Sequence, residues 1–140
     1  MADDVLIPIG RVAKWFGMRV SALRYYEEEG LLTTQRRNGR RHFNHADLRR
    51  LMLVRTYVEG AMLSLDEVRG LLAADSSPGR RSLVEERVPR LEAHIDSTCA
   101  ALRFLRHHTD HEHRDQLTCP RCERELRDRV ARLAGRDRTW

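Results

Sequence analysis

Residues 20–43 have the sequence VSALRYYEEEGLLTTQRRNGRRHF, which changes from a helical pattern to a hairpin pattern. The apolar residues of its first half recur at helical spacing, and Gly30 is a residue suited to ending a helix. Further along, Asn38-Gly39 accepts positive φ at both positions, which predicts a tight β-hairpin turn. Arginines flank this turn on both sides, so we expect the hairpin tip to face a phosphate backbone rather than a core.

The segments on either side of this stretch are predicted to be helical. The apolar residues of 9–16 recur at helical spacing between a proline and a glycine, so a short helix is expected there. Two short helices joined by a three- or four-residue turn are typical of a helix-turn-helix. After the hairpin, the pattern predicts a helix that Asn44 caps and that ends near Gly60. Another helix is expected after the capping box of residues 64–67.

The charge of the chain is unevenly distributed. Of its 140 residues, 26 are Lys or Arg and 21 are Asp or Glu, and all the basic residues except Lys14 are arginines. Residues 11–55 hold eleven basic and four acidic residues, a local net charge of +7, while the remainder is slightly acidic. A local basic excess is the usual footprint of a nucleic-acid-binding face, and the simpler alternative is a solvated arginine-rich surface.

Composition excludes several other classes of protein. No apolar run approaches the 18 or so residues of a membrane span, so no membrane partner is expected. The acidic start of the chain predicts no secretory signal, and we expect a cytoplasmic protein. The odd number of cysteines, three, argues against a disulfide scaffold.

A long helix is predicted after a linker at residues 75–81. Its apolar residues alternate steps of four and three, with Thr98 in the same series, and this heptad pattern indicates a helix that pairs with a second copy. Pro89 lies inside the pattern, so the helix either starts there or begins at a cap on Ser82 and is kinked by the proline; we favour the kink. The expected dimerisation residues are Val84, Val88, Leu91, Ile95, Leu102 and Leu105.

The C-terminal segment contains a group of histidines and cysteines. Cys119 and Cys122, with His111 and His113 upstream, offer four nitrogen and sulfur donors, enough for a tetrahedral Zn²⁺. Three interpretations stay open: a zinc-type metal site, a thiol switch whose cysteines open a short last helix, and a tail with no sensing role. Cys99, within the long helix, is expected to be a small buried hydrophobic residue.

The order Leu23-Arg24-Tyr25-Tyr26-Glu27, then Gly30-Leu31, then the arginine-rich hairpin, resembles the mercury-resistance-regulator (MerR) family. The resemblance implies a mainly α fold in which a winged helix-turn-helix domain carries a small β-hairpin wing. A long dimerisation helix, antiparallel to its partner in the dimer, and a short C-terminal helix follow. The expected segments are a DNA-binding domain at 7–74, the linker at 75–81, the dimerisation helix at 82–108 and an effector or accessory tail at 109–140.

In such a domain the second helix lies in the major groove, where arginine pairs with guanine edges. The wing arginines suit the phosphates of the flanking groove, and the resemblance adds one tyrosine hydroxyl and an arginine of the third helix near the DNA backbone. The expected DNA-binding residues are Arg19, Ser21, Arg24, Tyr25, Tyr26, Arg36, Arg37, Arg40, Arg41 and Arg55.

The resemblance implies a homodimeric transcription regulator and not an enzyme. Its partners would be double-stranded promoter DNA, a second copy of the chain, and RNA polymerase at the promoter. It would act by distorting a promoter whose elements are too far apart, in response to an effector bound beyond the dimerisation helix. Its length and its C-terminal cysteines favour a metal or a thiol-reactive signal. The alternative is an effector-independent architectural or excisionase-like DNA-binding protein.

Overall fold

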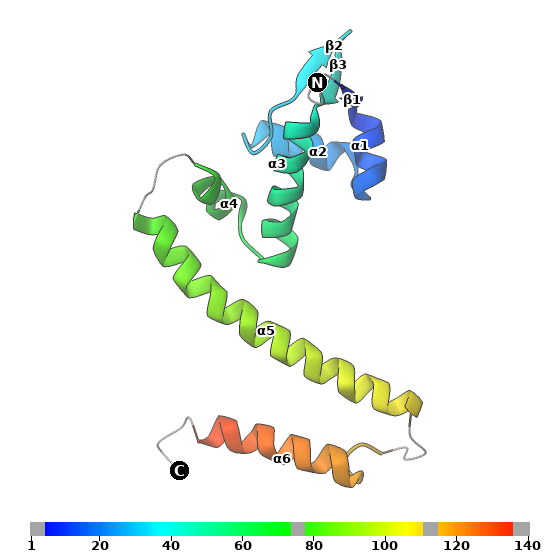
Figure 1. The fold of residues 1–140 in the computed structure, drawn as a ribbon, viewed down its shortest axis with the longest axis vertical. Coiled ribbons are helices and arrows are strands. Elements are labelled where there is room, and N and C mark those ends of the chain that lie inside the picture. The colour runs from blue at the N-terminus through cyan, green and yellow to red at the C-terminus, as the bar shows by residue number, and fades with distance from the viewer. Residues whose placement is uncertain (1–4, 74–77, 111–114, 136–140) are drawn as a thin grey trace. The chain divides into compact units, whose positions relative to one another are not determined.

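The computed structural model describes residues 5–73, 78–110 and 115–135, and most of these residues are helical (Figure 1). The chain divides into two compact units, one up to Val88 and one from Pro89 onward. Within the described residues, no helix is both long and apolar enough to cross a membrane.

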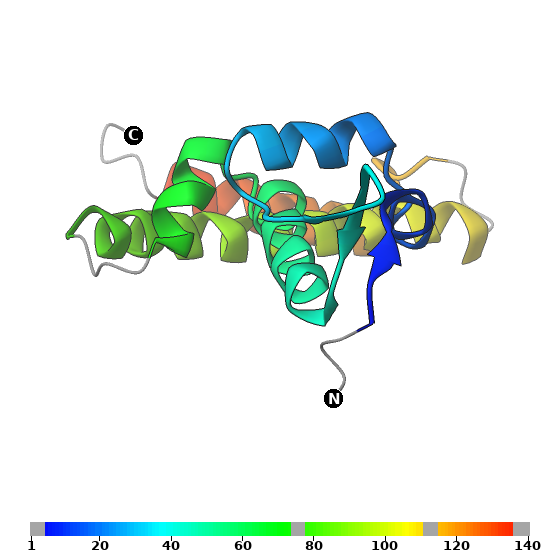
Figure 2. The ribbon, with the colours of Figure 1, turned by 90° about the horizontal axis from the view of Figure 1, so that it is seen from above.

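The first unit begins with the predicted helix-turn-helix. α1 (Ile9–Phe16) ends at Gly17, whose φ of 60° is the left-handed conformation that glycine adopts without strain. A short turn leads into α2 (Val20–Glu28). In Figure 2 α1 is seen end-on while α2 lies across the view, so the two helices cross rather than run side by side. This arrangement confirms the helix-turn-helix expected from the spacing of apolar residues.

The wing is a three-stranded antiparallel sheet in the order β1-β3-β2. β2 (Gln35–Arg37) and β3 (Arg40–Phe43) are joined by Asn38 and Gly39, with φ of 52° and 74°, which confirms the predicted hairpin turn. The third strand, β1 (Ile7–Pro8), pairs Ile7 with Phe43 and was not predicted. A two-residue strand has no periodicity of its own, and it forms because β3 offers its free edge.

Two capping boxes define the remaining helices of this unit. The Asn44 side chain accepts from the backbone N–H of Asp47 at the start of α3 (His45–Arg55), and a π-helical turn, η2 (Thr56–Gly60), completes that helix. Ser64 and Glu67 form the predicted box at the start of α4 (Leu65–Leu72). Each box satisfies backbone N–H groups that the first helical turn leaves without a partner.

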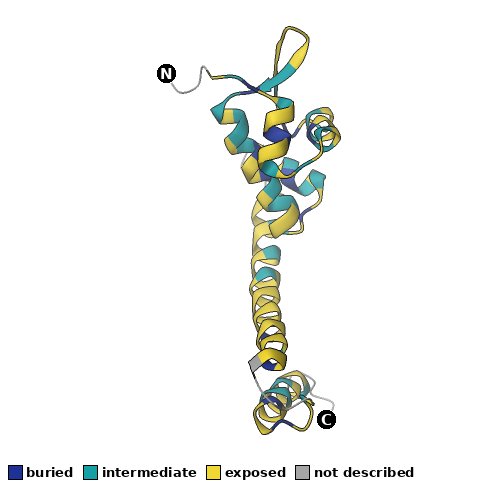
Figure 3. Cartoon of the chain, turned by 90° about the vertical axis from the view of Figure 1, so that its right-hand side faces the viewer, coloured by how far each residue is buried: buried dark blue, intermediate teal, exposed yellow. Residues whose placement is uncertain are grey.

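The core of the first unit lies where α1, α2, α3, α4 and the wing meet. Its largest fully buried side chains come from all four helices, from β3 and from the segment after α2, so these parts are held together by apolar contact. Figure 3 shows most of the buried residues in this unit, whereas α5 is mostly exposed. These side chains are Val12, Leu23, Leu31, Phe43, Leu51, Val54 and Val68.

The long helix α5 (Pro78–Asp110) is longer than predicted at both ends. It begins four residues before the expected start at 82, so residues 78–81 are helix rather than linker, and Ser82 is not its cap. Proline is well tolerated in a first helical turn, where its missing N–H would have no partner, which explains a start at Pro78. Residues 75–77 of the expected linker lie outside the described residues. The helix continues through Pro89 instead of starting there.

In the second unit the chain turns back, and α6 (Pro120–Ala134) runs antiparallel to the C-terminal part of α5. Two ion pairs show this direction, since Arg103 binds Glu125 at 2.6 Å while Asp96, earlier on α5, binds Arg129 at 3.8 Å. α6 is the last helix predicted from the sequence, and the second cysteine of the Cys119/Cys122 pair lies in its first turn.

Candidate nucleic-acid interface and His/Cys cluster

The helix α2 buries one side and exposes the other. Leu23 is completely buried in the core, whereas Ser21 and Arg24 are exposed. Arg19, the residue that precedes the helix, is exposed as well. All three predicted base-contacting residues of this helix therefore lie on accessible surface at its beginning.

The adjacent tyrosines differ in exposure. Tyr25 is 49% exposed, while Tyr26 is half-buried and packs against the core. Burial and the nearby Glu59 carboxylate raise the pKa of Tyr26 above its ordinary value, although Arg55 acts in the opposite direction. Tyr25 is thus the more accessible of the two tyrosines expected to bind DNA, and Tyr26 packs partly within the core.

The wing arginines fall into two groups. Arg36, Arg37 and Arg40 are exposed on the hairpin. Arg41 is half-buried, and its Nε donates to the carboxylate of Glu27 on α2. The Thr34 hydroxyl donates to the other oxygen of the same carboxylate at 2.6 Å. Arg41 therefore connects the wing to the second helix within the protein itself.

The Glu27 carboxylate is stabilised in its charged form by these contacts. Its partial burial acts to raise its pKa, but the hydrogen bonds from Thr34 and Arg41 and the charge of Arg36 outweigh burial. The pKa of Glu27 consequently lies below its ordinary value, and the carboxylate stays ionised at neutral pH.

A cleft of about 380 Å³ lies where the start of α1, the helix α2 and the wing meet. Four arginines from these three elements line it: Arg11, Arg24, Arg40 and Arg41. A concave surface with several guanidinium groups concentrates positive potential, which suits a phosphate backbone.

Arg11 is a residue of this cleft that the sequence analysis missed. Its guanidinium lies 5.3 Å from the centre of the Trp15 ring, a cation–π contact between successive turns of α1. The available signal was its position at the start of the basic segment, in the first turn of a predicted helix. Only the packing of α1 beside the wing distinguishes it from other surface arginines.

Arg55 has partners within the protein. Its Nη1 donates to the carbonyl oxygen of Phe16 at the end of α1, and its Nε binds Glu59 at 2.9 Å. These contacts fix the end of α1 relative to α3. Its expected position near the DNA backbone stays a prediction, and in this structure its guanidinium serves to connect two helices.

The second unit contains a cluster of three potential metal ligands. His107 on α5, Cys119 before α6 and Cys122 in its first turn each offer a ligand atom, and these atoms lie within 4.8 Å of one another. All three residues are buried. The predicted ligands His111 and His113 lie outside the described residues. His107 was missed because it falls within the expected dimerisation helix, where a histidine has no distinctive spacing.

The two thiols have different electrostatic environments. The backbone N–H of Cys122 at the start of α6 lowers the pKa of the Cys119 thiol, in spite of burial. Burial raises the pKa of the Cys122 thiol, and the neighbouring Cys119 sulfur adds to the effect. Cys119 is therefore the more readily ionised thiol of the pair.

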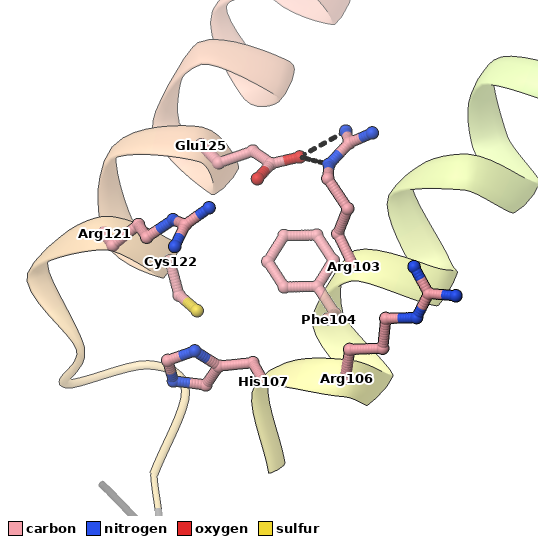
Figure 4. A pocket seen from close by; sticks show the side chains of 7 residues that line it. All are labelled: Arg103, Phe104, Arg106, His107, Arg121, Cys122 and Glu125. Atoms are coloured by element: carbon pink, nitrogen blue, oxygen red, sulfur yellow. Dashed lines mark hydrogen bonds and ion pairs between the residues drawn. The ribbon is translucent and has the colours of Figure 1, made fainter. Parts of the chain in front are cut away.

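A pocket of about 180 Å³ adjoins this cluster. Figure 4 shows the His107 ring and the Cys122 sulfur next to each other in its lining, with Arg103 bound to Glu125 above them. Phe104 and two further arginines complete the lining, so the pocket is both small and cationic: Arg103, Phe104, Arg106, His107, Arg121, Cys122 and Glu125.

The predicted dimerisation residues form a largely exposed apolar row on α5. Leu91 is half-buried, and the other five are between 44% and 66% exposed. Cys99 on the same helix is also exposed, so the expectation that it is buried is wrong for the single chain.

Comparison with known proteins defines the class. A family model described as MerR HTH family regulatory protein matches residues 7–75. The HTH-type transcriptional regulator ZntR homolog of Haemophilus influenzae is 30% identical over 101 residues, which make up 71% of this chain and 73% of that protein. The helix-turn-helix, the wing and these matches define a DNA-binding transcription regulator. The chain belongs to the MerR family.

Two solved structures have a similar fold. HiNmlR, a MerR family regulator lacking the sensor domain and bound to promoter DNA, gives a TM-score of 0.59 at 24% identity over 74% of this chain and 86% of its own. A MerR family regulator from Bacillus thuringiensis gives 0.56 at 24% identity, over 73% of this chain and 95% of its own. These likenesses confirm the mainly α fold with a small wing and a long helix.

Proposed function

We propose that the chain is a homodimeric regulator that binds double-stranded promoter DNA and distorts it, in response to a metal or thiol-reactive signal. The observation that supports this most directly is the cleft in which Arg24 of α2 and Arg40 of the wing lie together. Base-contacting and phosphate-contacting side chains must come from adjacent elements if one duplex is to touch both.

In this proposal α2 enters the major groove. Arg19, Ser21 and Arg24 face the base edges, where arginine discriminates guanine by about 1–3 kcal/mol. The exposed wing residues Arg36, Arg37 and Arg40 bind phosphates of the flanking groove, together with Arg11 and Tyr25. Arg41, Arg55 and Tyr26 position these groups through their contacts within the protein and lie near the DNA backbone.

The homodimer is formed by α5. Its apolar row is exposed in the single chain, and two antiparallel copies would cover both rows. A two-fold dimer presents two α2 helices to two half-sites, so a near-palindromic operator is expected. Bending or untwisting the DNA between the half-sites would then let RNA polymerase engage promoter elements that are otherwise too far apart.

A solved protein of the same fold supports this proposal, since HiNmlR is described as bound to promoter DNA. The test is selection of genomic DNA fragments by the purified full chain at low ionic strength, followed by footprinting. We expect protection of two related half-sites by a dimer. A chain that sediments as a monomer, or that selects no DNA, would contradict the proposal.

Promoter distortion has its own test. Transcription with purified RNA polymerase would be measured from a selected promoter and from variants with a shortened spacer between its two elements. If the protein acts by distortion, shortening the spacer makes transcription independent of it. Equal dependence on the protein at every spacer length would favour an architectural role instead.

A further inference from the structure

We propose that His107, Cys119 and Cys122 form a binding site for one thiophilic divalent cation of the zinc class. The three ligand atoms lie within 4.8 Å of one another, and all three side chains are buried. The inference supplies a ligand set for the signal of the proposed regulator. Metal binding can be measured without DNA, so the two proposals can fail separately.

The spacing of the ligand atoms is close to what a tetrahedral site requires. With metal–sulfur bonds of about 2.3 Å and metal–nitrogen bonds of about 2.0–2.1 Å, ligand atoms in such a site lie about 3.5–3.8 Å apart. The observed separations of at most 4.8 Å therefore need a contraction of about 1 Å or less. Side-chain rotation around a bound ion can supply a movement of that size.

Comparison of the three clustered residues with similar residues nearby also supports a metal site. His108 and Cys99 are of the same chemical types, lie on the same helix and are exposed. The chain thus brings one histidine and two cysteines together in a buried cluster and leaves their nearest equivalents in solvent. Buried cysteine alone is ordinary core packing, but two buried thiols beside a buried imidazole match the donor set that zinc prefers.

The charge and the type of the ligand atoms determine which cation the site can bind. Binding would release the two thiol protons, and the two negative charges of the thiolates, with a neutral imidazole, balance the charge of one divalent cation. Arg103, Arg106 and Arg121 line the adjoining pocket and would repel a cation held by neutral donors. Hard cations such as Mg²⁺ and Ca²⁺ prefer oxygen ligands, so sulfur donors select zinc and similar metals.

Contacts beside the cluster hold its two helices together. Glu125 of α6 binds Arg103 of α5, and Gln116 donates to the carbonyl oxygen of Phe104. Because His107 belongs to α5 while Cys119 immediately precedes α6 and Cys122 lies in its first turn, a bound ion would fasten α6 to α5. Metal loss would then loosen this attachment.

The test is the metal content of the full chain purified under reducing conditions, together with titration by Co²⁺. Cobalt in a tetrahedral thiolate site absorbs strongly in the visible, so it reports the donor set directly. We expect about one zinc per chain, and a cobalt spectrum with thiolate character. Cys119→Ser, Cys122→Ser and His107→Gln should each lower cobalt affinity at least about tenfold.

Matched controls are available on the same helix. His108→Gln and Cys99→Ser alter exposed residues outside the cluster and should leave cobalt affinity and spectrum unchanged. Circular dichroism of every variant shows whether α5 and α6 stay folded. The proposal is overturned if the folded wild-type chain takes up neither zinc nor cobalt, or if folded His107→Gln binds cobalt with the wild-type affinity and spectrum.

Discussion

The carboxylate of Glu27, near the end of α2, binds the Nε of Arg41 on β3 and accepts a 2.6 Å hydrogen bond from Thr34. The pair joins the helix that we place in the major groove to the wing that we place on phosphates. A second acidic residue of the same run acts similarly, since Glu29 binds Arg69 of α4 at 2.8 Å. The acidic end of α2 thus connects this helix to the elements around it.

Replacing Glu27 with glutamine should loosen the wing. The variant keeps the size of the side chain but removes the charge that Arg41 faces, so we expect a loss of about 1 kcal/mol in the free energy of unfolding. Urea unfolding followed by circular dichroism measures the loss, and amide hydrogen exchange of residues 35–43 locates it. Glu28→Gln is the control, because Glu28 is exposed beside it. Equal behaviour of the two variants would show that the Glu27–Arg41 pair contributes nothing.

The same pair should make stability depend on pH in a defined window. The pKa of Glu27 is lowered in the folded chain, so its contribution is fully present above the ordinary value of about 4.5 and is lost as pH falls through the folded-state pKa. The difference in stability between wild type and Glu27→Gln should therefore be constant near neutral pH and shrink below pH 4.5. Unfolding measured at a series of pH values checks this, and a difference that grows on acidification would contradict it.

Two arginines of the proposed interface should have different effects on DNA binding. Arg24→Ala should reduce discrimination between operator and random DNA, by about 1–3 kcal/mol for each half-site. Arg37→Ala should weaken binding to all sequences alike. It should also lower the slope of log affinity against log salt by about 0.9 per lost phosphate contact, or about 1.8 per dimer.

Fluorescence anisotropy at several salt concentrations measures both effects. Arg127→Ala is the control, because it removes the same charge from an exposed ion pair on α6. If Arg127→Ala alters the salt slope as much as Arg37→Ala does, the wing has no specific contact with phosphate.

A charge placed in the apolar row of α5 should separate the dimer. Ile95 is 62% exposed in the single chain and would be covered in the dimer, so Ile95→Glu would bury an unpaired carboxylate from each copy. We expect the dimer dissociation constant to rise at least about 100-fold, measured by sedimentation equilibrium. Ala93→Glu changes an exposed residue away from the heptad positions and should leave the dimer intact. A dimer that tolerates Ile95→Glu must form through another surface.

Local chemistry determined most of the first unit. Asn38-Gly39 dictates the turn of the wing because both residues tolerate positive φ, and Ser64 with Glu67 marks the start of α4 because they satisfy its first N–H groups. The order of tyrosines, glycines and arginines also determined the family. These features depend on residues within a few positions of one another, so sequence alone is enough to predict them.

Only the tertiary structure shows which role each of several chemically similar residues has. Nothing in the sequence distinguishes Arg40 from Arg41, yet Glu27 binds one while the other lies exposed on the wing. In the same way, His107 lies with Cys119 and Cys122 only because the chain reverses between α5 and α6, whereas its neighbour His108 stays in solvent. These assignments depend on contacts between residues 12 or more positions apart, and such contacts are set by how helices and strands pack, not by local sequence.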